Sequence, residues 1–328
     1  MQKEEVIIIG AGPCGLSAAL ELKRKGIEPL LIEKGNVANA IYHYPTHQTF
    51  FSSSEKLEIG NMPFISERQK PVRNEALTYY RMVAQRSDLR INNFERVDQI
   101  RQSHNMFQLK TTTDKGDEIY YQADYIVVAT GYYDHPNKLN IPGEDLPHVS
   151  HYFKEAHPFF DKNVVVIGGK NSAVDATLEL EKAGANVTVL YRGADYSPSV
   201  KPWILPLFES LVKHRKINMH FNSNIKEIQT KHVKAVIDGK EQLIDADFVF
   251  AMTGYHPDHS FLKHIGIEIN DETGRPLFDR HTMETNVQNI YIAGVIAAGY
   301  NNNEIFIENG RHHGKLIADH IQNKKESR

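Results

Sequence analysis

A chain of 328 residues, 41% hydrophobic and 24% charged, has the composition of a globular protein long enough for two domains. Its formal net charge of −3 gives no basic character and no indication of a nucleic-acid partner. The single cysteine, Cys14, excludes an internal disulfide or a C-x-x-C pair, and the seventeen histidines are scattered without a metal-ligand spacing. The acidic start does not fit a signal peptide, and no apolar run approaches the roughly 18 residues of a membrane span. We therefore expect a cytoplasmic protein with no membrane segment and no metal site.

The first segments predict a strand, a helix and a second strand. A β-branched run at residues 6–9 is followed by glycines, by a helical pattern at 16–26 and by another apolar run at 29–34. Continuous apolar runs of this length are typical of buried strands in a parallel sheet. The three segments together predict a βαβ unit.

The loop that opens this first helix has the sequence GAGPCG at residues 10–15, which fits the pattern G-x-G-x-x-G. Gly10 allows a tight turn, Gly12 lets the backbone approach a pyrophosphate, and Gly15 lets helix and strand pack closely. Glu33 ends the next strand, where a carboxylate can accept hydrogen bonds from both ribose hydroxyls of an adenosine. The unit therefore predicts a dinucleotide site; the alternative is a glycine turn beside a surface glutamate.

A hairpin pattern occurs twice. Residues 107–131 predict strands around a Lys115-Gly116 turn that run into a buried strand ending in Thr130-Gly131. Residues 233–254 repeat this order, with a turn at Asp238-Gly239 and a buried strand that ends in Gly254. The repetition indicates that the chain contains two related halves.

A second βαβ unit is predicted from a strand at 163–169, a helix at 172–184 and a strand at 186–192. Its loop, GGKNSA at 168–173, has Lys170 where the middle glycine is expected and Ala173 at the third glycine position. Arg192 stands where the first unit has Glu33, and an arginine can bind a 2′-phosphate that an acid would repel. This predicts a preference for NADPH over NADH, unless Arg192 is only a solvated surface charge.

The remaining patterns complete an α/β fold class with two Rossmann-like dinucleotide-binding domains. A buried strand is expected at 290–295 and an amphipathic helix near 304–323. Linkers are marked by Pro136, Pro142 and Pro147 on one side of the second unit and by Pro257 on the other.

Two dinucleotide loops, two Thr-Gly strands and a late IYIAG strand resemble the flavoproteins with two dinucleotide-binding domains, in the thioredoxin-reductase-like architecture. The resemblance implies an FAD-binding domain formed by residues 1–150 and 256–328, with an NADPH-binding domain at 151–255 between them. It places FAD and NADPH on the following residues: for FAD, Gly10, Gly12, Pro13, Gly15, Glu33, Lys34, Gln48, Ser52, Val97, Thr130, Gly131 and Gly294; for NADPH, Gly168, Gly169, Lys170, Asn171, Ser172, Ala173 and Arg192.

Two features depart from thioredoxin reductases. The stretch before the second loop, residues 149–162, contains no C-x-x-C pair. Gly294 is followed by Val295, where those enzymes have an aspartate that holds the flavin ribityl chain. The first departure excludes a thioredoxin reductase, and the second means that the ribityl contact is lost or is made by another group.

A closer resemblance is to the bacillithiol-disulfide reductases of Gram-positive bacteria. It is carried by GPCG and by the stretches at 44–64, 151–161, 168–173, 196–206 and 293–310. In that family NADPH reduces FAD, whose electrons reduce the disulfide of a small thiol, and the single cysteine stands in the first loop. The resemblance thus implies an NADPH-dependent flavoprotein disulfide reductase with a small-molecule disulfide substrate, which we expect to be a homo-oligomer.

The role of Cys14 has two interpretations. A helix N-terminus lowers a thiol pKa, which favours catalysis by Cys14. Its loop position, below the pyrophosphate, favours a small inert residue in a tight turn instead. Five further residues, which follow the two Thr-Gly strands, also have two interpretations. They line the substrate pocket, or they merely pack the domain linkers: Tyr132, Tyr133, His135, Tyr255 and His256.

Three other functions fit parts of the sequence. An NADPH–ferredoxin or flavodoxin reductase shares the architecture and also lacks the dithiol. A flavin monooxygenase would need an F-x-G-x-x-x-H signature before the second loop, which is missing. A non-enzymatic NADPH sensor would need no FAD.

Overall fold

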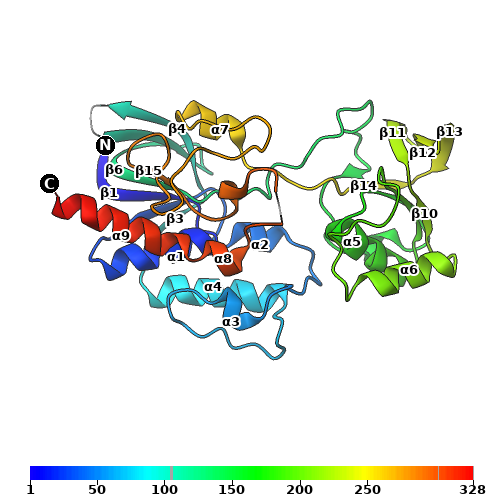
Figure 1. The fold of residues 1–328 in the computed structure, drawn as a ribbon, viewed down its shortest axis with the longest axis horizontal. Coiled ribbons are helices and arrows are strands. Elements are labelled where there is room, and N and C mark those ends of the chain that lie inside the picture. The colour runs from blue at the N-terminus through cyan, green and yellow to red at the C-terminus, as the bar shows by residue number, and fades with distance from the viewer. Residues whose placement is uncertain (104–105, 302, 328) are drawn as a thin grey trace. The chain divides into compact units, whose positions relative to one another are not determined.

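The computed structural model describes residues 1–103, 106–301 and 303–327, which form two compact units (Figure 1). Unit 1 contains Met1–His135 and Tyr255–Arg328, and unit 2 is the continuous segment Pro136–Gly254. The first boundary was expected after residue 150. Residues 136–150 belong to unit 2 because β7 (Val149–Ser150) pairs with β14 (Phe248–Ala251) in the sheet of that unit.

Unit 1 is built on a seven-stranded sheet with the order β3-β2-β1-β6-β5-β4, in which β15 also pairs with β6. The strands β1, β2, β3, β6 and β15 are parallel, whereas β4, β5 and β6 form an antiparallel meander. Because both faces of the parallel part are covered, Val6–Ile9 is buried throughout, as the apolar run predicts. The strand bounds are β1 Gln2–Ile9, β2 Leu30–Glu33, β3 Arg90–Asn93, β4 Glu95–Ser103, β5 Met106–Thr113, β6 Glu118–Val128 and β15 Ile290–Ile292.

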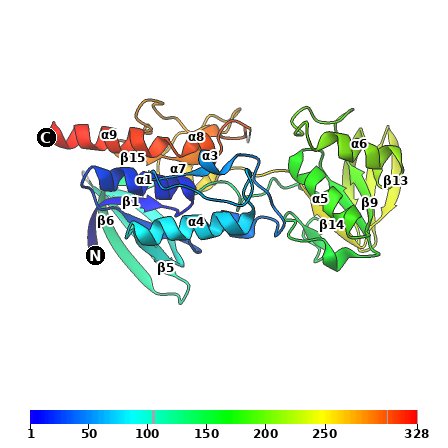
Figure 2. The ribbon, with the colours of Figure 1, turned by 90° about the horizontal axis from the view of Figure 1, so that it is seen from below.

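Helices cover this sheet, and the first helix packs beside the last one. In both views α1 (Pro13–Arg24) runs along α9 (His313–Glu326), although the two are far apart in sequence (Figures 1 and 2). The contact is close because a Cβ at Gly314 would lie 2.6 Å from the Cα of Ala18. The other helices of unit 1 are α2 Asn39–His43, α3 Ser54–Leu57, α4 Arg73–Arg86, α7 His259–His264, α8 Ile307–Gly310 and the 3₁₀ helix η2 Gly294–Ala298.

Unit 2 contains a five-stranded parallel sheet with the order β10-β9-β8-β14-β7 and a three-stranded antiparallel sheet, β11-β12-β13. The predicted second βαβ unit is β8 (Asn163–Ile167), α5 (Asn171–Lys182) and β9 (Asn186–Leu190). The predicted hairpin at Asp238-Gly239 joins two strands of the antiparallel sheet. The remaining bounds are β10 Asn218–His220, β11 Ser223–Ile228, β12 His232–Ile237, β13 Lys240–Asp245, α6 Leu205–Lys213 and the 3₁₀ helix η1 His157–Phe159.

Candidate functional site

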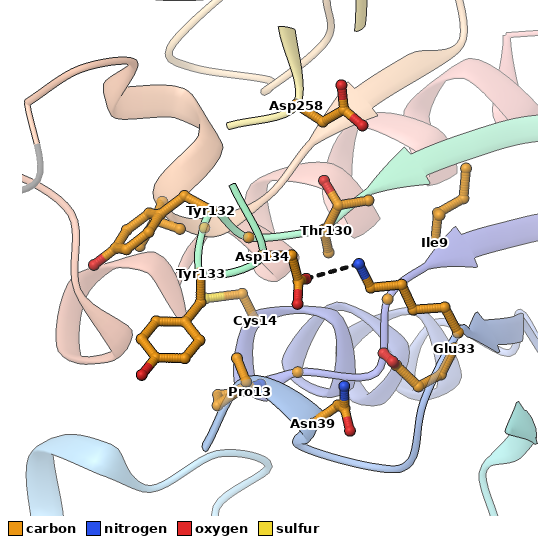
Figure 3. A pocket seen from close by; sticks show the side chains of 18 of the residues that line it. Ile9, Pro13, Cys14, Glu33, Asn39, Thr130, Tyr132, Tyr133, Asp134 and Asp258 are labelled. Atoms are coloured by element: carbon orange, nitrogen blue, oxygen red, sulfur yellow. Dashed lines mark ion pairs between the residues drawn. The ribbon is translucent and has the colours of Figure 1, made fainter. Parts of the chain in front are cut away.

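A cavity of about 240 Å³ lies in unit 1, where β1, β2, β6 and β15 end (Figure 3). Ligands of open parallel sheets bind at the carboxyl ends of the strands, so its position fits a nucleotide site. It brings together residues that lie far apart in the sequence. The lining includes these residues predicted for FAD: Gly10, Gly12, Pro13, Glu33, Lys34, Val97, Thr130, Gly131 and Gly294, together with Cys14.

The three glycines of the first loop have different structural roles. Gly10 has a φ of +105°, and a Cβ there would lie 2.6 Å from the carbonyl oxygen of Ala129. A Cβ at Gly15 would lie 2.0 Å from the carbonyl oxygen of Gly10, so this glycine allows helix and strand to pack and does not line the cavity. At Gly12 the Cβ position has no neighbouring atom within 4 Å. Gly12 therefore leaves open space on the cavity wall, as the close approach of a dinucleotide requires.

Glu33 organises the same loop from the end of β2. One carboxylate oxygen accepts a hydrogen bond from the N–H of Ala11 and the other accepts one from Gly35, both at 2.8 Å. Burial raises the pKa of Glu33, and these two hydrogen bonds partly oppose that rise. Each carboxylate oxygen has two acceptor positions, so capacity remains for the ribose hydroxyls of an adenosine. The side chain thus fits the role that its position predicts.

Two residues that line the cavity form an ion pair. Nζ of Lys34, which follows Glu33, lies 2.8 Å from a carboxylate oxygen of Asp134, in the loop after β6 (Figure 3). Lys34 was predicted as a cofactor contact, whereas Asp134 was not. The pair joins the loop after β2 to the loop after β6.

Several aromatic side chains lie close together around the loop that follows β6. The rings of Tyr44 and Tyr133 lie 5.0 Å apart, and that of Tyr255 lies 4.6 Å from Tyr133. Burial raises the pKa of Tyr44 and of Tyr132, so both are neutral phenols at physiological pH. Of the five residues considered for a substrate pocket, Tyr132, Tyr133 and His135 line the cavity, whereas Tyr255 and His256 do not.

Cys14 is the second residue of α1, and its sulfur is enclosed by glycines from the C-terminal part of the chain. A Cβ at Gly294 would lie 2.9 Å from Sγ of Cys14, and one at Gly310 would lie 3.0 Å from it. Burial raises the thiol pKa from 9.0 to about 12. A thiol with this pKa is protonated at neutral pH, in contrast to the thiolate expected from its place at a helix N-terminus.

Gln48 and Ser52, two further residues predicted for FAD, lie outside this cavity. The hydroxyl of Ser52 donates to a carboxylate oxygen of Glu308 at 2.8 Å, and the carbonyl of Gln48 accepts from the N–H of Arg73. Some cavity-lining residues were not predicted from the sequence: Asn39, Tyr44, Glu95, Arg96, Asp134, Asp258, Phe261 and Ile307. Two of these residues are sequence neighbours of predicted ones, since Arg96 precedes Val97 and Asp134 follows Tyr133. Their position in the sequence was the only feature that could have predicted them.

The second glycine loop lies in unit 2. Gly168 has a φ of +140°, with a Cβ position 2.5 Å from the carbonyl oxygen of Met252, and Ala173 is buried. Lys170 is the exposed N-cap of α5. Arg192 is exposed just after β9, at the place that corresponds to Glu33. The residues predicted for NADPH therefore lie just after the carboxyl ends of β8 and β9, two neighbouring parallel strands of unit 2.

The side chain of Asn171 fixes a neighbouring loop to this second site. Its amide nitrogen donates to the carbonyl of Ser199 at 2.9 Å, and its oxygen accepts from the N–H of Lys201 at 2.9 Å. Asn171 was predicted as an NADPH contact. In the structure both ends of its amide hold residues 199–201.

The described part of the chain contains no cluster of three histidine, cysteine or acidic side chains that could hold a metal ion. None of the helices in that part of the chain is long and apolar enough to cross a bilayer.

Two nucleotide-binding folds, one carrying a glycine-loop cavity, define the class of two-domain pyridine-nucleotide oxidoreductases. The chain belongs to the family described as pyridine nucleotide-disulphide oxidoreductase, whose model matches residues 7–294. It is 60% identical over 328 residues to bacilliredoxin reductase Bdr of Bacillus subtilis, an alignment that covers 99% of each chain.

Solved structures agree with this assignment. The structure of bacillithiol disulfide reductase Bdr from Bacillus cereus is 62% identical with a TM-score of 0.98, covering 98% of this chain and 100% of that chain. Thioredoxin reductase of T. acidophilum has a TM-score of 0.75 at 23% identity, covering 99% and 100%, and shares the fold. The predicted thioredoxin-reductase-like fold, the resemblance to the bacillithiol-disulfide reductases and the use of FAD and NADPH by an oxidoreductase are confirmed.

Proposed function

We propose that this protein is an NADPH-dependent flavoprotein that reduces bacillithiol disulfide. The reaction consumes one disulfide, one NADPH and one proton, and it yields two thiols and NADP⁺. The observation that carries the proposal is near-full-length identity of about 60% to proteins named for this redox system, combined with a lone cysteine in the wall of the glycine-loop cavity.

FAD is assigned to the cavity of unit 1. Gly12 and Pro13 would border the pyrophosphate, Glu33 would accept hydrogen bonds from the adenosine ribose, and Val97 would offer backbone groups to the adenine. The open Cβ position of Gly12 and the cavity-lining carboxylate of Glu33 support this placement. Thr130, Gly131 and Gly294, which line the same cavity, would border the rest of the cofactor. Bound FAD supplies two-electron transfer between NADPH and the disulfide.

NADPH is assigned to the loop 168–173 of unit 2, with Arg192 as the group that binds its 2′-phosphate. A guanidinium forms charge-assisted hydrogen bonds with phosphate, and Arg192 is exposed beside the loop. The side chain of Asn171 holds residues 199–201 next to the same helix N-terminus.

Cys14 is the proposed nucleophile. Its thiolate attacks one sulfur of the substrate, the substrate S–S bond breaks, and one thiol leaves while the other stays bound to Cys14. The chain has no second cysteine to resolve the mixed disulfide. Its cleavage to the free Cys14 thiol and the second product thiol takes up two electrons and two protons, and bound FAD would supply the electrons from NADPH. Burial keeps the thiol protonated, so catalysis requires a change in its surroundings when substrate is bound. The alternative is reduction of the disulfide without participation of Cys14.

The test compares the wild-type protein with the Cys14→Ala variant, both loaded with FAD and kept anaerobic. NADPH oxidation is followed with bacillithiol disulfide and, as a control, with glutathione disulfide. The proposal predicts that the wild type prefers bacillithiol disulfide, and that Cys14→Ala still accepts hydride from NADPH but no longer turns over the disulfide. Full activity of the variant would assign Cys14 to packing, and a wild type inactive with bacillithiol disulfide would refute the proposed substrate.

A second candidate substrate is a small redox protein in its disulfide form. The name of the Bacillus subtilis relative, bacilliredoxin reductase, favours it. The same anaerobic assay with such a protein replacing the small disulfide distinguishes the two. We also propose that the protein is a homo-oligomer and that it acts in the cytoplasm. The second proposal is supported by the single cysteine, because a chain without disulfides suits a reducing compartment.

A further inference from the structure

His313, the first residue of α9, makes a hydrogen bond that no part of the proposed function uses. Its Nδ1 accepts from the backbone N–H of Gly294 at 3.1 Å. Gly294 is the first residue of η2, stands one residue after the end of β15 and lines the cavity. The side chain of His313 therefore joins the start of the last helix to a backbone turn in the cavity wall.

The protonation state of His313 is fixed by this contact. An imidazole that accepts at Nδ1 carries its proton on Nε2. Burial, helped by the neighbouring His312, lowers the pKa of His313 from 6.5 to about 4, so the ring is neutral at physiological pH. The acceptor lone pair is therefore available whenever the protein is near neutrality.

The turn that His313 holds is also the turn that encloses the thiol. A Cβ at Gly294 would approach Sγ of Cys14 to 2.9 Å, so the glycine backbone lies directly against the sulfur. Gly294 has a φ of +81°, a left-handed conformation that glycine adopts without strain. A short chain of contacts thus runs from the ring of His313 through the Gly294 backbone to Cys14.

We propose that His313 is a positioning residue whose Nδ1 holds Gly294 against Cys14 and thereby sets both the burial of the thiol and the shape of the cavity wall that receives FAD. Only the part about FAD rests on the proposed function. Without the acceptor, the Gly294 N–H loses its partner, η2 moves away from the sulfur, and the thiol becomes more hydrated.

The test uses two amide variants that differ in where they place an oxygen. In His313→Asn the amide oxygen can occupy the position of Nδ1, whereas in His313→Gln the longer chain carries it toward the position of Nε2. His312→Asn is the matched control, because His312 is adjacent but exposed. Folding of each variant is checked by circular dichroism. The measured quantities are the alkylation rate of Cys14 by iodoacetamide in FAD-free protein at pH 8 and the Kd for FAD.

We expect His313→Gln to be alkylated about tenfold faster than wild type, because each unit of fall in thiol pKa raises the thiolate fraction about tenfold. Its Kd for FAD should rise by a similar factor. His313→Asn and His312→Asn should stay close to wild type in both measurements. If the Gln variant fails to fold while the Asn variant folds, the requirement for an acceptor at Nδ1 is supported.

Two results would overturn the proposal. One is wild-type alkylation and FAD affinity in His313→Gln, and the other is a His313→Asn variant as impaired as His313→Gln. Neither measurement uses bacillithiol disulfide. A wild type that fails to reduce that substrate would therefore refute the proposed function and leave this result standing.

Discussion

The reactivity of Cys14 depends on residues from the far end of the chain. The G-x-G-x-x-G pattern places the thiol at the start of a helix, and a helix N-terminus favours a thiolate. In the folded chain Gly294 and Gly310 close on the sulfur, and burial raises its pKa to about 12. The local position of Cys14 was predictable from the sequence. Its surroundings were not, because no local pattern shows which glycines pack against it.

His313 gives the pH dependence of stability a definite sign. Its folded pKa of about 4 lies below the ordinary 6.5, so between these values the unfolded chain binds the proton and the folded chain does not. The contribution is complete above pH 6.5 and is lost as the pH falls toward 4. From pH 7 to pH 5 the loss should be up to about 2 kcal/mol. Urea unfolding of FAD-free wild type and His313→Asn checks this, since the variant should lose less; equal losses would contradict it.

In the proposed function, Arg192 determines the preference for NADPH over NADH. Charge-assisted hydrogen bonds contribute about 1.5–3 kcal/mol, so Arg192→Ala should raise the KM for NADPH roughly tenfold to a hundredfold. NADH has no 2′-phosphate, and its KM should barely change. Arg215→Ala, an exposed arginine of the same unit, is the control. A similar loss with both coenzymes would indicate that Arg192 has a structural role instead.

The helices and strands with a strong local sequence pattern lie where that pattern predicts them. The strands β1, β2, β8 and β9 and the helices α1 and α5 lie where apolar runs and helical patterns place them. The last helix was expected as one element near 304–323, but the structure divides it into α8 and α9. The division lies between two residues with tertiary contacts: Gly310, which packs on Cys14, and His313, which accepts a hydrogen bond from the N–H of Gly294.

Two glycines beside α1 and α8 should respond differently to alanine. A Cβ at Gly310 would lie 3.0 Å from Sγ of Cys14 and 3.1 Å from the Cα of Gly294. Gly310→Ala should therefore destabilise the FAD-free protein by about 1–3 kcal/mol. Gly12→Ala should leave that stability unchanged, since its Cβ enters open space, yet it should weaken FAD binding. Urea unfolding and FAD titration separate the effects, and a stable Gly310→Ala variant would contradict the packing.

The two units of the chain have separate hydrophobic cores. One core contains the buried residues of unit 1, and two smaller cores lie in unit 2. The repeated βαβ and hairpin patterns predicted this internal repetition. The first boundary of unit 2 was harder to predict, because the two-residue strand β7 that ties residues 136–150 to β14 has no distinctive pattern.

Separate cores predict that each cofactor stabilises its own unit. A ligand at a hundred times its Kd stabilises the folded form by about 2.7 kcal/mol. FAD should therefore slow amide hydrogen exchange in β1 and β6 of unit 1, and NADP⁺ should slow it in β8 and β14 of unit 2. Mass spectrometry of peptic fragments would measure both. If FAD, added without NADP⁺, slowed exchange in unit 2 and not in unit 1, the assignment of FAD to the cavity of unit 1 would be wrong.

In the proposed reaction, electrons from NADPH end on a disulfide. The most direct test is the stoichiometry of the anaerobic reaction of the FAD-loaded wild-type protein with bacillithiol disulfide, measured as thiols released for each NADPH oxidised. The balanced reaction predicts two thiols for each NADPH. NADPH oxidation without thiol release, or oxidation that proceeds only when oxygen is admitted, would contradict it.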